Sequence, residues 1–186
     1  MNKKKIIGKR VYLEDFNYEH IVNPQYLSWV KDPIVMKYIG RPEFEKDVTY
    51  QKVEAYLENI KKNPNIHFFS VYRSENHKFI GTAKLNFFDD SLIRFGVADI
   101  GIMIGDKEQW GFGLGGEVIS ALSNFAFKFL NARKLTAGAS CENIGVIKVF
   151  EKNGYKKEGV LRSQLNFNGT YVDHVLLGCF PEELCQ

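Results

Sequence analysis

The sequence predicts a mixed α/β (α+β) fold in a single domain that spans residues 1–186. Runs with the two-residue period of strands and runs with the 3.6-residue period of helices follow one another along the whole chain. No linker, internal repeat or low-complexity segment separates them. The length of 186 residues, with 45% hydrophobic and 25% charged residues, is suited to one folded core.

The first part of the chain predicts a strand followed by a short helix. Between Arg10 and Glu14 apolar residues alternate with polar ones, which is the period of a half-buried strand. The segment Tyr26–Val30 predicts a helix, and Pro24 and Pro33 limit its length because proline disrupts helical hydrogen bonding.

A second, amphipathic helix is expected before residue 63. Asp47 or Thr49 provides an N-cap, and Asn63 and Pro64 end the run. Its apolar positions recur at helical spacing among lysines and glutamates: Val53, Tyr56, Leu57 and Ile60.

The middle of the chain predicts three strands. Phe68–Tyr72 and Phe79–Phe87 are rich in β-forming residues, and the turn-forming segment Ser74–His77 separates them, so we expect an antiparallel hairpin. Ala98–Ile104 predicts the next strand.

The remainder predicts a helix, a strand, a helix and two strands. A long helix is expected from Leu114, with an apolar face formed by Val118, Leu122, Phe125, Ala126 and Phe129. A strand at Leu135–Ser140 and a helix at Asn143–Asn153 follow. The last two strands begin at Tyr155 and Thr170, with Asn168-Gly169 as their hairpin turn.

Composition argues against several classes of function. The net charge of +3 comes from acidic and basic residues mixed along the chain, so no nucleic-acid partner is expected. No run reaches the roughly 18 apolar residues that cross a bilayer, so no membrane partner is expected. The three cysteines lack CxxC or Cys/His spacing, so neither a disulfide framework nor a metal site is expected. These features suit a cytoplasmic protein.

A glycine-rich segment lies between the predicted strand at Ala98–Ile104 and the long helix. Four glycines in Trp110–Glu117 let the backbone approach a ligand and direct its N–H groups outward. The N-terminus of the following helix adds unpaired amides and a favourable dipole. The segment therefore predicts a diphosphate-binding loop, and a flexible turn is the alternative.

Two other phosphate-binding motifs fit this segment poorly. Gly111, Gly113 and Gly116 spell GxGxxG, but nothing acidic falls between Glu117 and Glu142, where a dinucleotide site needs a carboxylate. The loop also comes late in the chain rather than after a first strand. A P-loop would need Gly-Lys-Ser/Thr, which the segment lacks.

Two separated motifs resemble the GNAT acetyltransferases, especially the branch of ribosomal-protein N-terminal acetyltransferases and their relatives that acetylate small molecules. The segment Trp110–Gly115 is similar to the family's pyrophosphate loop, whose first position is usually Arg or Gln and often Trp in this branch. Asn143, Ile147 and Glu151–Tyr155 resemble the family's Asn-containing helix that closes in Glu-Lys-x-Gly-aromatic. The likeness extends from about Trp29 to Asp173.

This resemblance implies the GNAT fold, in which a mixed sheet splays open between its fourth and fifth strands. Here these strands are Ala98–Ile104 and Leu135–Ser140. The donor would be acetyl-CoA, with its pantetheine arm in the gap. The residues that the resemblance assigns to acetyl-CoA are Ile102, Met103, Ile104, Trp110, Gly111, Phe112, Gly113, Leu114, Gly115, Gly116, Asn143, Lys148 and Lys152. The two lysines are assigned to the adenosine phosphates.

Acetyl transfer to an alkylammonium requires loss of a proton, a polarised carbonyl and a proton for the departing thiolate. Asp99 is the expected base, and a structural hydrogen bond is its alternative role. Many GNAT enzymes place a tyrosine before the Glu-Lys pair as general acid, but this sequence has Phe150, which has no proton to donate. Ser140 or a bound water is left as the expected acid. Cys141 is expected to be structural rather than nucleophilic.

The acceptor side is expected around Trp29–Thr49. Trp29, Tyr38 and Arg41 are the expected substrate contacts, with Arg41 suited to an anionic acceptor and the two aromatic residues alternatively in the core. The acceptor is expected to be an amino sugar on a nucleotide carrier, with a polyamine or a protein N-terminus as alternatives. A CoA-binding regulatory module without transfer activity is the alternative of another class. The family also implies a possible homodimer.

Overall fold

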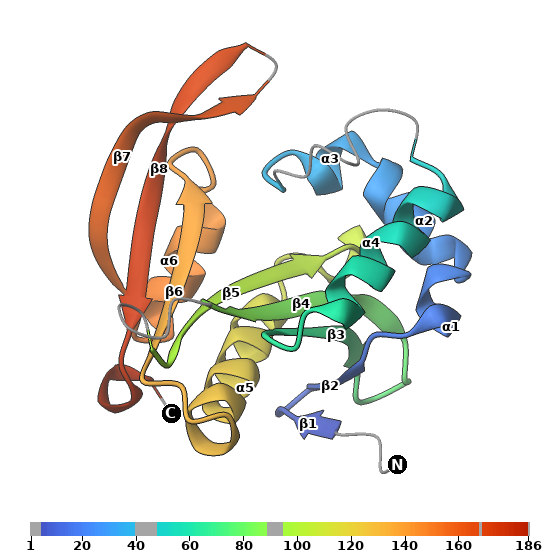
Figure 1. Cartoon of the computed structure of the whole chain (residues 1–186), viewed down its shortest axis with the longest axis horizontal. Helices are drawn as coiled ribbons and strands as arrows, with labels where there is room; N and C mark the ends of the chain where they lie inside the picture. The colour runs from blue at the N-terminus through green and yellow to red at the C-terminus, as the bar shows by residue number, and fades with distance from the viewer. Residues whose placement is uncertain (1–4, 40–47, 89–94, 168, 186) are drawn as a thin grey trace.

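The computed structural model describes residues 5–39, 48–88, 95–167 and 169–185. Within these ranges eight strands form one sheet in the order β1-β2-β3-β4-β5-β6-β8-β7 (Figure 1). The strands are β1 (Lys5–Ile7), β2 (Val11–Asp15), β3 (Ile66–Arg73), β4 (Phe79–Phe87), β5 (Val97–Ile104), β6 (Lys134–Ser140), β7 (Lys156–Phe167) and β8 (Thr170–Cys179).

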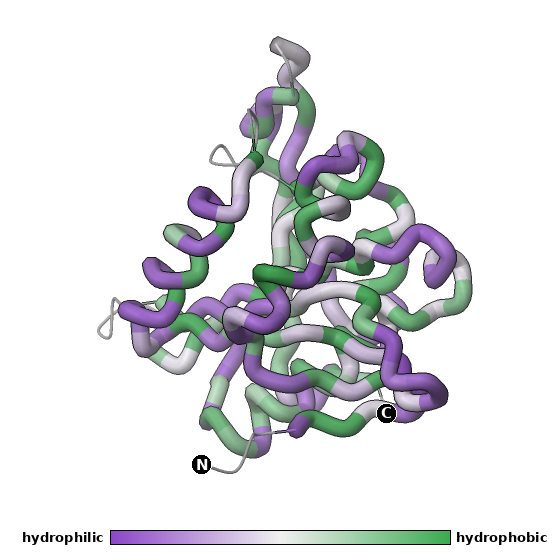
Figure 2. The backbone as a smooth tube through the Cα atoms, turned by 90° about the vertical axis from the view of Figure 1, so that its right-hand side faces the viewer, coloured by the Kyte–Doolittle hydropathy of each residue, from purple (hydrophilic) through white to green (hydrophobic). Residues whose placement is uncertain are grey.

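Helices cover the two faces of this sheet. The helices are α1 (Tyr18–Ile21), α2 (Pro24–Lys31), α3 (Pro33–Met36), α4 (Tyr50–Lys62), α5 (Leu114–Phe129) and α6 (Ile144–Lys152), with 3-10 turns η2 (Lys107–Gln109) and η3 (Pro181–Glu183). Helices α1 to α4 lie together over one face, and α5 lies across the other (Figure 1). Polar and apolar residues alternate along the elements, as Figure 2 shows, because most elements have one face in a core.

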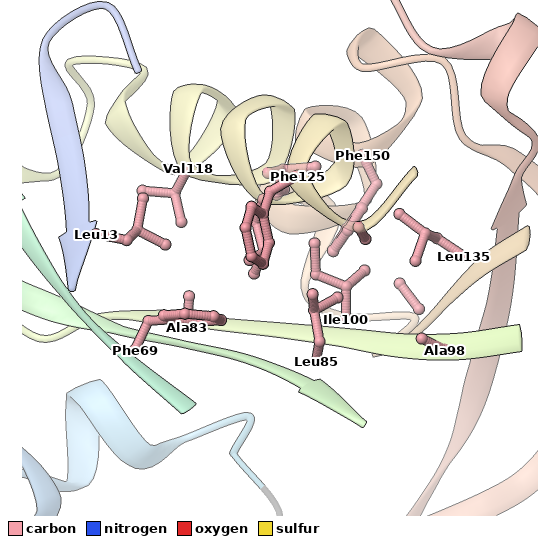
Figure 3. Packing of buried hydrophobic residues seen from close by; sticks show 14 of the residues in the cluster. Leu13, Phe69, Ala83, Leu85, Ala98, Ile100, Val118, Phe125, Leu135 and Phe150 are labelled. Carbon is pink, nitrogen blue, oxygen red and sulfur yellow. The ribbon is translucent and has the colours of Figure 1, made fainter. Parts of the chain in front are cut away.

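The larger core lies between α5 and the sheet. Val118 and Phe125 of α5 point toward Phe69, Leu85 and Ile100 of the central strands (Figure 3). The buried residues of α5 recur every three or four positions, so one side of the helix is apolar. This core holds α5, and therefore the loop at its N-terminus, in a fixed position on the sheet.

A second, aromatic core lies on the opposite face, beneath α1 to α4. Trp29 of α2 packs against Phe79 of β4 with ring centroids 4.9 Å apart, and Tyr26 packs edge-on against Trp29 at 6.5 Å. Val53, Leu57 and Ile60 of α4 complete this core. Because both faces of the central strands are covered, each contains a run of consecutive buried residues, Phe68–Val71 in β3 and Phe79–Ala83 in β4.

The sheet opens between β5 and β6. These two strands run parallel, and they pair only where Val97–Asp99 of β5 lies opposite Lys134–Thr136 of β6. Beyond Asp99, β5 keeps its antiparallel pairing with β4 as far as Gly81 and Ile104. β6 keeps its pairing with β8 as far as Ser140 and His174. The edges of β5 and β6 that face each other therefore separate toward the glycine-rich loop.

The fold class predicted from the sequence is confirmed, and so is the splayed sheet. The splayed strands are the fifth and sixth rather than the fourth and fifth, because Lys5–Ile7 forms an additional first strand that the sequence prediction omits. Helices α1 and α3 are also absent from that prediction, because each has only four residues and no resolvable period. Thr49 caps α4, as expected, by accepting the Lys52 N–H; Asp47 lies outside the described residues.

Candidate active site at the opening of the sheet

A cavity of about 1140 Å³ occupies the opening of the sheet. Its walls come from β4, β5, the glycine-rich loop, the start of α5, the end of β6 and α6, together with α2 and α3 on the other side. Lys37, Lys84, Asp99 and Lys152 are the charged residues among its described lining. The cavity thus connects a backbone-rich region near α5 with a largely apolar region beneath α2 and α3.

The glycine-rich loop presents unpaired amides to this cavity. Gly111 and Gly113 have φ values of +83° and +77°, which L-residues with side chains rarely adopt. Gly113 is the N-cap of α5 and has no side chain to bond the first amides of the helix. Leu114 and Gly115 therefore keep N–H groups free for a ligand. The Gly116 N–H is partly used, because it donates to the Gly113 carbonyl at 3.1 Å.

Trp110 and Phe112 lie differently from each other in this loop. The Trp110 indole Nε1 donates to the Ile104 carbonyl at 2.7 Å, so its ring folds back on the end of β5 and lines the cavity. The Phe112 side chain is exposed and lies outside the cavity lining.

Strand β5 provides the wall next to β6. Ile102, Met103 and Ile104 line the cavity after β5 has separated from β6. The edge of this stretch that faces β6 has no neighbouring strand, so its backbone groups are available to an extended ligand, apart from the Ile104 carbonyl, which accepts the Trp110 indole N–H. The family resemblance assigns these three positions to acetyl-CoA, and the structure places all three in the cavity wall.

Asp99 lies where the two strands separate. Its carboxylate accepts a hydrogen bond from Thr136 Oγ1 on β6 at 3.1 Å. Burial raises its pKa above the ordinary value of 3.8, while the Thr136 hydrogen bond and the charge of Lys84 act in the opposite direction. A carboxyl group with a raised pKa inside a cavity is a suitable proton acceptor.

Ser140, Asn143 and Phe150 line the opposite wall. Ser140 is buried, and its Oγ accepts the Glu142 N–H at 3.3 Å. Asn143 caps α6 by accepting the Val146 N–H at 3.3 Å, which leaves its amide NH₂ group for the cavity. Phe150 is buried against Tyr155 at a centroid distance of 4.9 Å. No phenolic proton donor therefore stands at residue 150.

Of the two lysines assigned to the adenosine phosphates, only Lys152 lines the cavity. Lys148 is exposed on α6 and lies outside the lining. The two residues are one turn of α6 apart, so both side chains lie on the same side of the helix. Lys152 is the one whose side chain is close enough to contact a ligand in the cavity.

On the acceptor side, Tyr38 lines the cavity and Trp29 does not. The Tyr38 ring contacts Phe167 near the tip of the β7–β8 hairpin at 6.0 Å, edge to face, so the two sides of the cavity touch there. Trp29 is buried over Gly105, where a side chain would clash with its indole. Trp29 therefore supports the wall from behind rather than contacting a substrate. Arg41 lies outside the described residues.

Sequence reasoning did not single out two further residues near the site. His174 of β8 covers Gly138 of β6, and burial lowers the pKa of its imidazole. Arg10 binds both Glu117 and the carbonyl of Phe112. Neither contact has a signal in the sequence, because the partners come from elements far apart in the chain.

The three cysteines give a direct test of which residues the fold buries. Cys141 and Cys185 are exposed, whereas Cys179 is buried and its pKa is raised to about 12, chiefly by burial. We expect a thiol reagent at about pH 8 to label two cysteines of the native protein rapidly and the third only in denaturant, because the thiolate is the reactive form. Mass spectrometry of the labelled peptides checks this. Rapid labelling of Cys179 in the native protein would contradict the burial described here.

Among the described residues, no group of three or more His, Cys, Asp or Glu side chains is arranged to hold a metal ion. In the same part of the chain, no helix has the length and apolarity needed to span a membrane.

Comparison with known proteins identifies a family. Residues 10–156 match the acetyltransferase (GNAT) domain family. The chain is 30% identical over 129 residues to the probable N-acetyltransferase YjcK of Bacillus subtilis, covering 68% of each chain. It is 26% identical over 180 residues to the uncharacterized N-acetyltransferase p20 of Bacillus licheniformis, covering 97% of this chain and 95% of that relative.

Solved structures share the fold at low sequence identity. RimJ of Mycobacterium smegmatis in complex with CoA-disulfide has a TM-score of 0.83 at 15% identity. The match covers 100% of this chain and 91% of the RimJ chain. The spermidine N-acetyltransferase of Vibrio cholerae in complex with CoA and spermine has a TM-score of 0.80 at 19% identity, covering 94% and 97%. The family match over most of the chain and the splayed sheet agree, and this protein belongs to the GNAT acetyltransferase family.

Proposed function

We propose that this protein is an N-acetyltransferase that transfers an acetyl group from acetyl-CoA directly to a primary amine. The observation that carries this proposal is the continuous cavity that leads from the unpaired amides of the glycine-rich loop, along the open edge of β5, to Asp99. A donor with a diphosphate at one end and a thioester at the other fits this succession of groups.

The loop and the edge of β5 provide the donor site in this proposal. The amides of Gly113, Leu114 and Gly115 bind the pyrophosphate, because they are unpaired and lie at the positive end of the α5 dipole. The backbone of the remaining loop residues fixes the conformation in which these amides face the pyrophosphate. These residues are Trp110, Gly111, Phe112 and Gly116. The edge at Ile102–Ile104 binds the pantetheine amides as a neighbouring strand would, and Asn143 binds the same arm from α6. Lys152 contributes a positive charge toward the adenosine phosphates.

Direct transfer then requires four events around Asp99. Asp99, alone or through a water molecule, removes a proton from the alkylammonium. The freed amine attacks the thioester carbonyl carbon, whose oxygen a backbone N–H on the open edge of β5 polarises. The carbon–sulfur bond breaks as the nitrogen gives up its second proton, and the thiolate of CoA leaves. Ser140 or water passes that proton to the thiolate, since Phe150 has no proton to donate.

For the acceptor we propose an amino sugar on a nucleotide carrier. Asp99 is the one carboxylate among the described lining residues of the cavity, and Lys84 acts on it electrostatically. This lining disfavours a polycation such as spermidine, which would need several carboxylates, and is compatible with an acceptor that carries anionic groups. Tyr38 supplies an aromatic face at the same opening. A protein N-terminus is the second acceptor, because the Tyr38 ring at the cavity and the Phe167 ring packed against it offer apolar contacts to a peptide.

The acceptor proposal predicts an order of activity. We expect acetylation of a nucleotide amino sugar to exceed that of spermidine, with a short peptide bearing a free N-terminus between them, as measured by CoA thiol release at equal acceptor concentrations. Acetylation of spermidine or of the peptide in preference to every nucleotide amino sugar would overturn the acceptor assignment and leave the donor assignment intact.

Thermal unfolding with and without acetyl-CoA tests the donor assignment. A ligand that binds only the folded state stabilises it by about 2.7 kcal/mol at a hundred times its dissociation constant. We therefore expect a saturable rise in the unfolding midpoint with acetyl-CoA. No rise at millimolar acetyl-CoA would overturn the proposal. A clear rise without thiol release for any amine would instead favour a CoA-binding module that lacks transfer activity, a role for which Phe150 is the supporting observation.

A further inference from the structure

Arg10 connects the edge of the sheet to the glycine-rich loop. Its Nε donates to Glu117 Oε1 at 2.5 Å, and its backbone N–H donates to Glu117 Oε2 at 2.8 Å. Its Nη2 donates to the Phe112 carbonyl at 2.9 Å. One arginine thus binds both the loop and the first turn of α5, across 107 positions of sequence in the case of Glu117.

The backbone of Arg10 is itself held firmly. Its carbonyl accepts the Ser74 N–H at 2.9 Å, next to the pairing of Val11 with Arg73. The neighbouring residues Val11 and Leu13 lie in the main core with no exposed surface. The guanidinium therefore extends from a fixed part of the sheet, so its contacts restrict the loop rather than move with it.

The contact with Phe112 determines where one loop amide points. A peptide unit is planar and trans, so its carbonyl and the following N–H point in opposite directions. Because the Phe112 carbonyl is held toward Arg10, the Gly113 N–H is directed away from Arg10. Gly113 lines the cavity and Arg10 does not. The hydrogen bond from Arg10 thus favours the orientation in which Gly113 presents its N–H to the cavity.

The contact with Glu117 has an electrostatic consequence. Glu117 is in the first turn of α5, at the same helix end that would bind a diphosphate. An unpaired carboxylate there would repel that diphosphate. The Arg10 guanidinium pairs with it at 2.5 Å, and the Glu117 side chain is only 20% exposed, so solvent screens the pair incompletely.

We propose that Arg10 is a positioning residue for the donor site: it orients the 112–113 peptide toward the diphosphate of CoA and neutralises Glu117 beside it. This inference rests on the proposed function, because it concerns the same donor site. It assigns no chemical step to Arg10, which lies outside the cavity.

The test compares ligands with and without the diphosphate. In Arg10→Ala, we expect the dissociation constant of CoA, measured by calorimetry, to rise about tenfold or more, as expected when a charge-assisted hydrogen bond is lost. The KM for acetyl-CoA should rise in parallel, with kcat at saturation changed by less than about threefold. With S-acetylpantetheine, which has no diphosphate, kcat/KM should stay within about twofold of the wild-type value.

Three further variants separate positioning from stability. Arg10→Lys keeps the charge but lacks the planar fork, so its CoA affinity should lie between those of wild type and Arg10→Ala, and it carries the test if Arg10→Ala does not fold. Glu117→Gln can still accept from Arg10 and should bind CoA within about threefold of wild type. Arg73→Ala is the matched control, since Arg73 pairs with Glu75 at 2.9 Å on the neighbouring strand.

The outcomes are distinguishable. Wild-type affinity for CoA in a folded Arg10→Ala protein would overturn the inference while leaving the proposed function intact. Equal losses with acetyl-CoA and S-acetylpantetheine would also overturn it, because the effect would not involve the diphosphate. A wild-type protein that binds no CoA would overturn the proposed function, and this inference with it.

Discussion

Replacement of Asp99 by Asn is expected to lower kcat by about a hundredfold or more, the usual range for loss of a general base. The amide oxygen of the new side chain would still accept the hydrogen bond from Thr136 Oγ1, so the local geometry should be kept while the proton acceptor is lost. Affinity for acetyl-CoA should not change, because Asp99 lies at the base of the opening and the glycine-rich loop at its other end. Steady-state kinetics and calorimetry on the same preparation measure both quantities.

The same substitution predicts a pH-dependent gain in stability. Burial raises the pKa of Asp99 in the folded state, so the fold favours the protonated form, and this favourable contribution is lost as pH rises through the folded-state pKa. An asparagine side chain carries no charge at any pH. The variant should therefore be more stable than wild type at neutral pH, with the difference vanishing below the unfolded pKa of 3.8. Thermal unfolding across this pH range measures the difference.

Asp15→Asn is the matched control for both effects. Asp15 is exposed at the end of β2, so its substitution should alter neither turnover nor the pH dependence of stability. Unchanged kcat in Asp99→Asn across pH would eliminate Asp99 as the base and leave the structural hydrogen bond to Thr136 as its role.

A loss of donor binding is expected for Gly113→Val. Gly113 has φ +77°, a conformation that costs an L-residue roughly 1–2 kcal/mol and a β-branched residue more. The variant relieves this strain by moving the loop, which displaces the amides of Leu114 and Gly115 from their present orientation. The stabilisation of about 2.7 kcal/mol expected from acetyl-CoA at a hundredfold its dissociation constant should then be lost. Thermal unfolding with and without acetyl-CoA measures this.

Gly169→Val separates loop geometry from general strain. Gly169 has φ +87° in the β7–β8 turn, and a Cβ there would meet nothing within 4 Å. Both variants should lower the unfolding midpoint without ligand, but Gly169→Val should keep the full shift with acetyl-CoA. A normal acetyl-CoA shift in Gly113→Val would show that the loop backbone does not bind the donor.

Much of the secondary structure could be predicted because its causes are local. The alternation in Val11–Asp15, the N-cap at Thr49 and the apolar stripe of α5 each depend on residues within a few positions of one another. The short elements β1, α1 and α3 could not be predicted, since three or four residues carry no measurable period. Their positions depend on packing against β2, α2 and α4.

The order of the longer strands and helices, the glycine-rich loop between β5 and α5 and the two motifs of the family could all be read from the amino acids alone. Three features of the site required the folded chain: Trp29 faces the core, Asp99 is buried beside Thr136, and Arg10 binds Glu117. The physical reason is the distance along the chain over which each kind of interaction acts. Backbone propensity and periodicity act between residues close in sequence, whereas burial, pKa and ion pairing depend on which distant segments the folded sheet brings together.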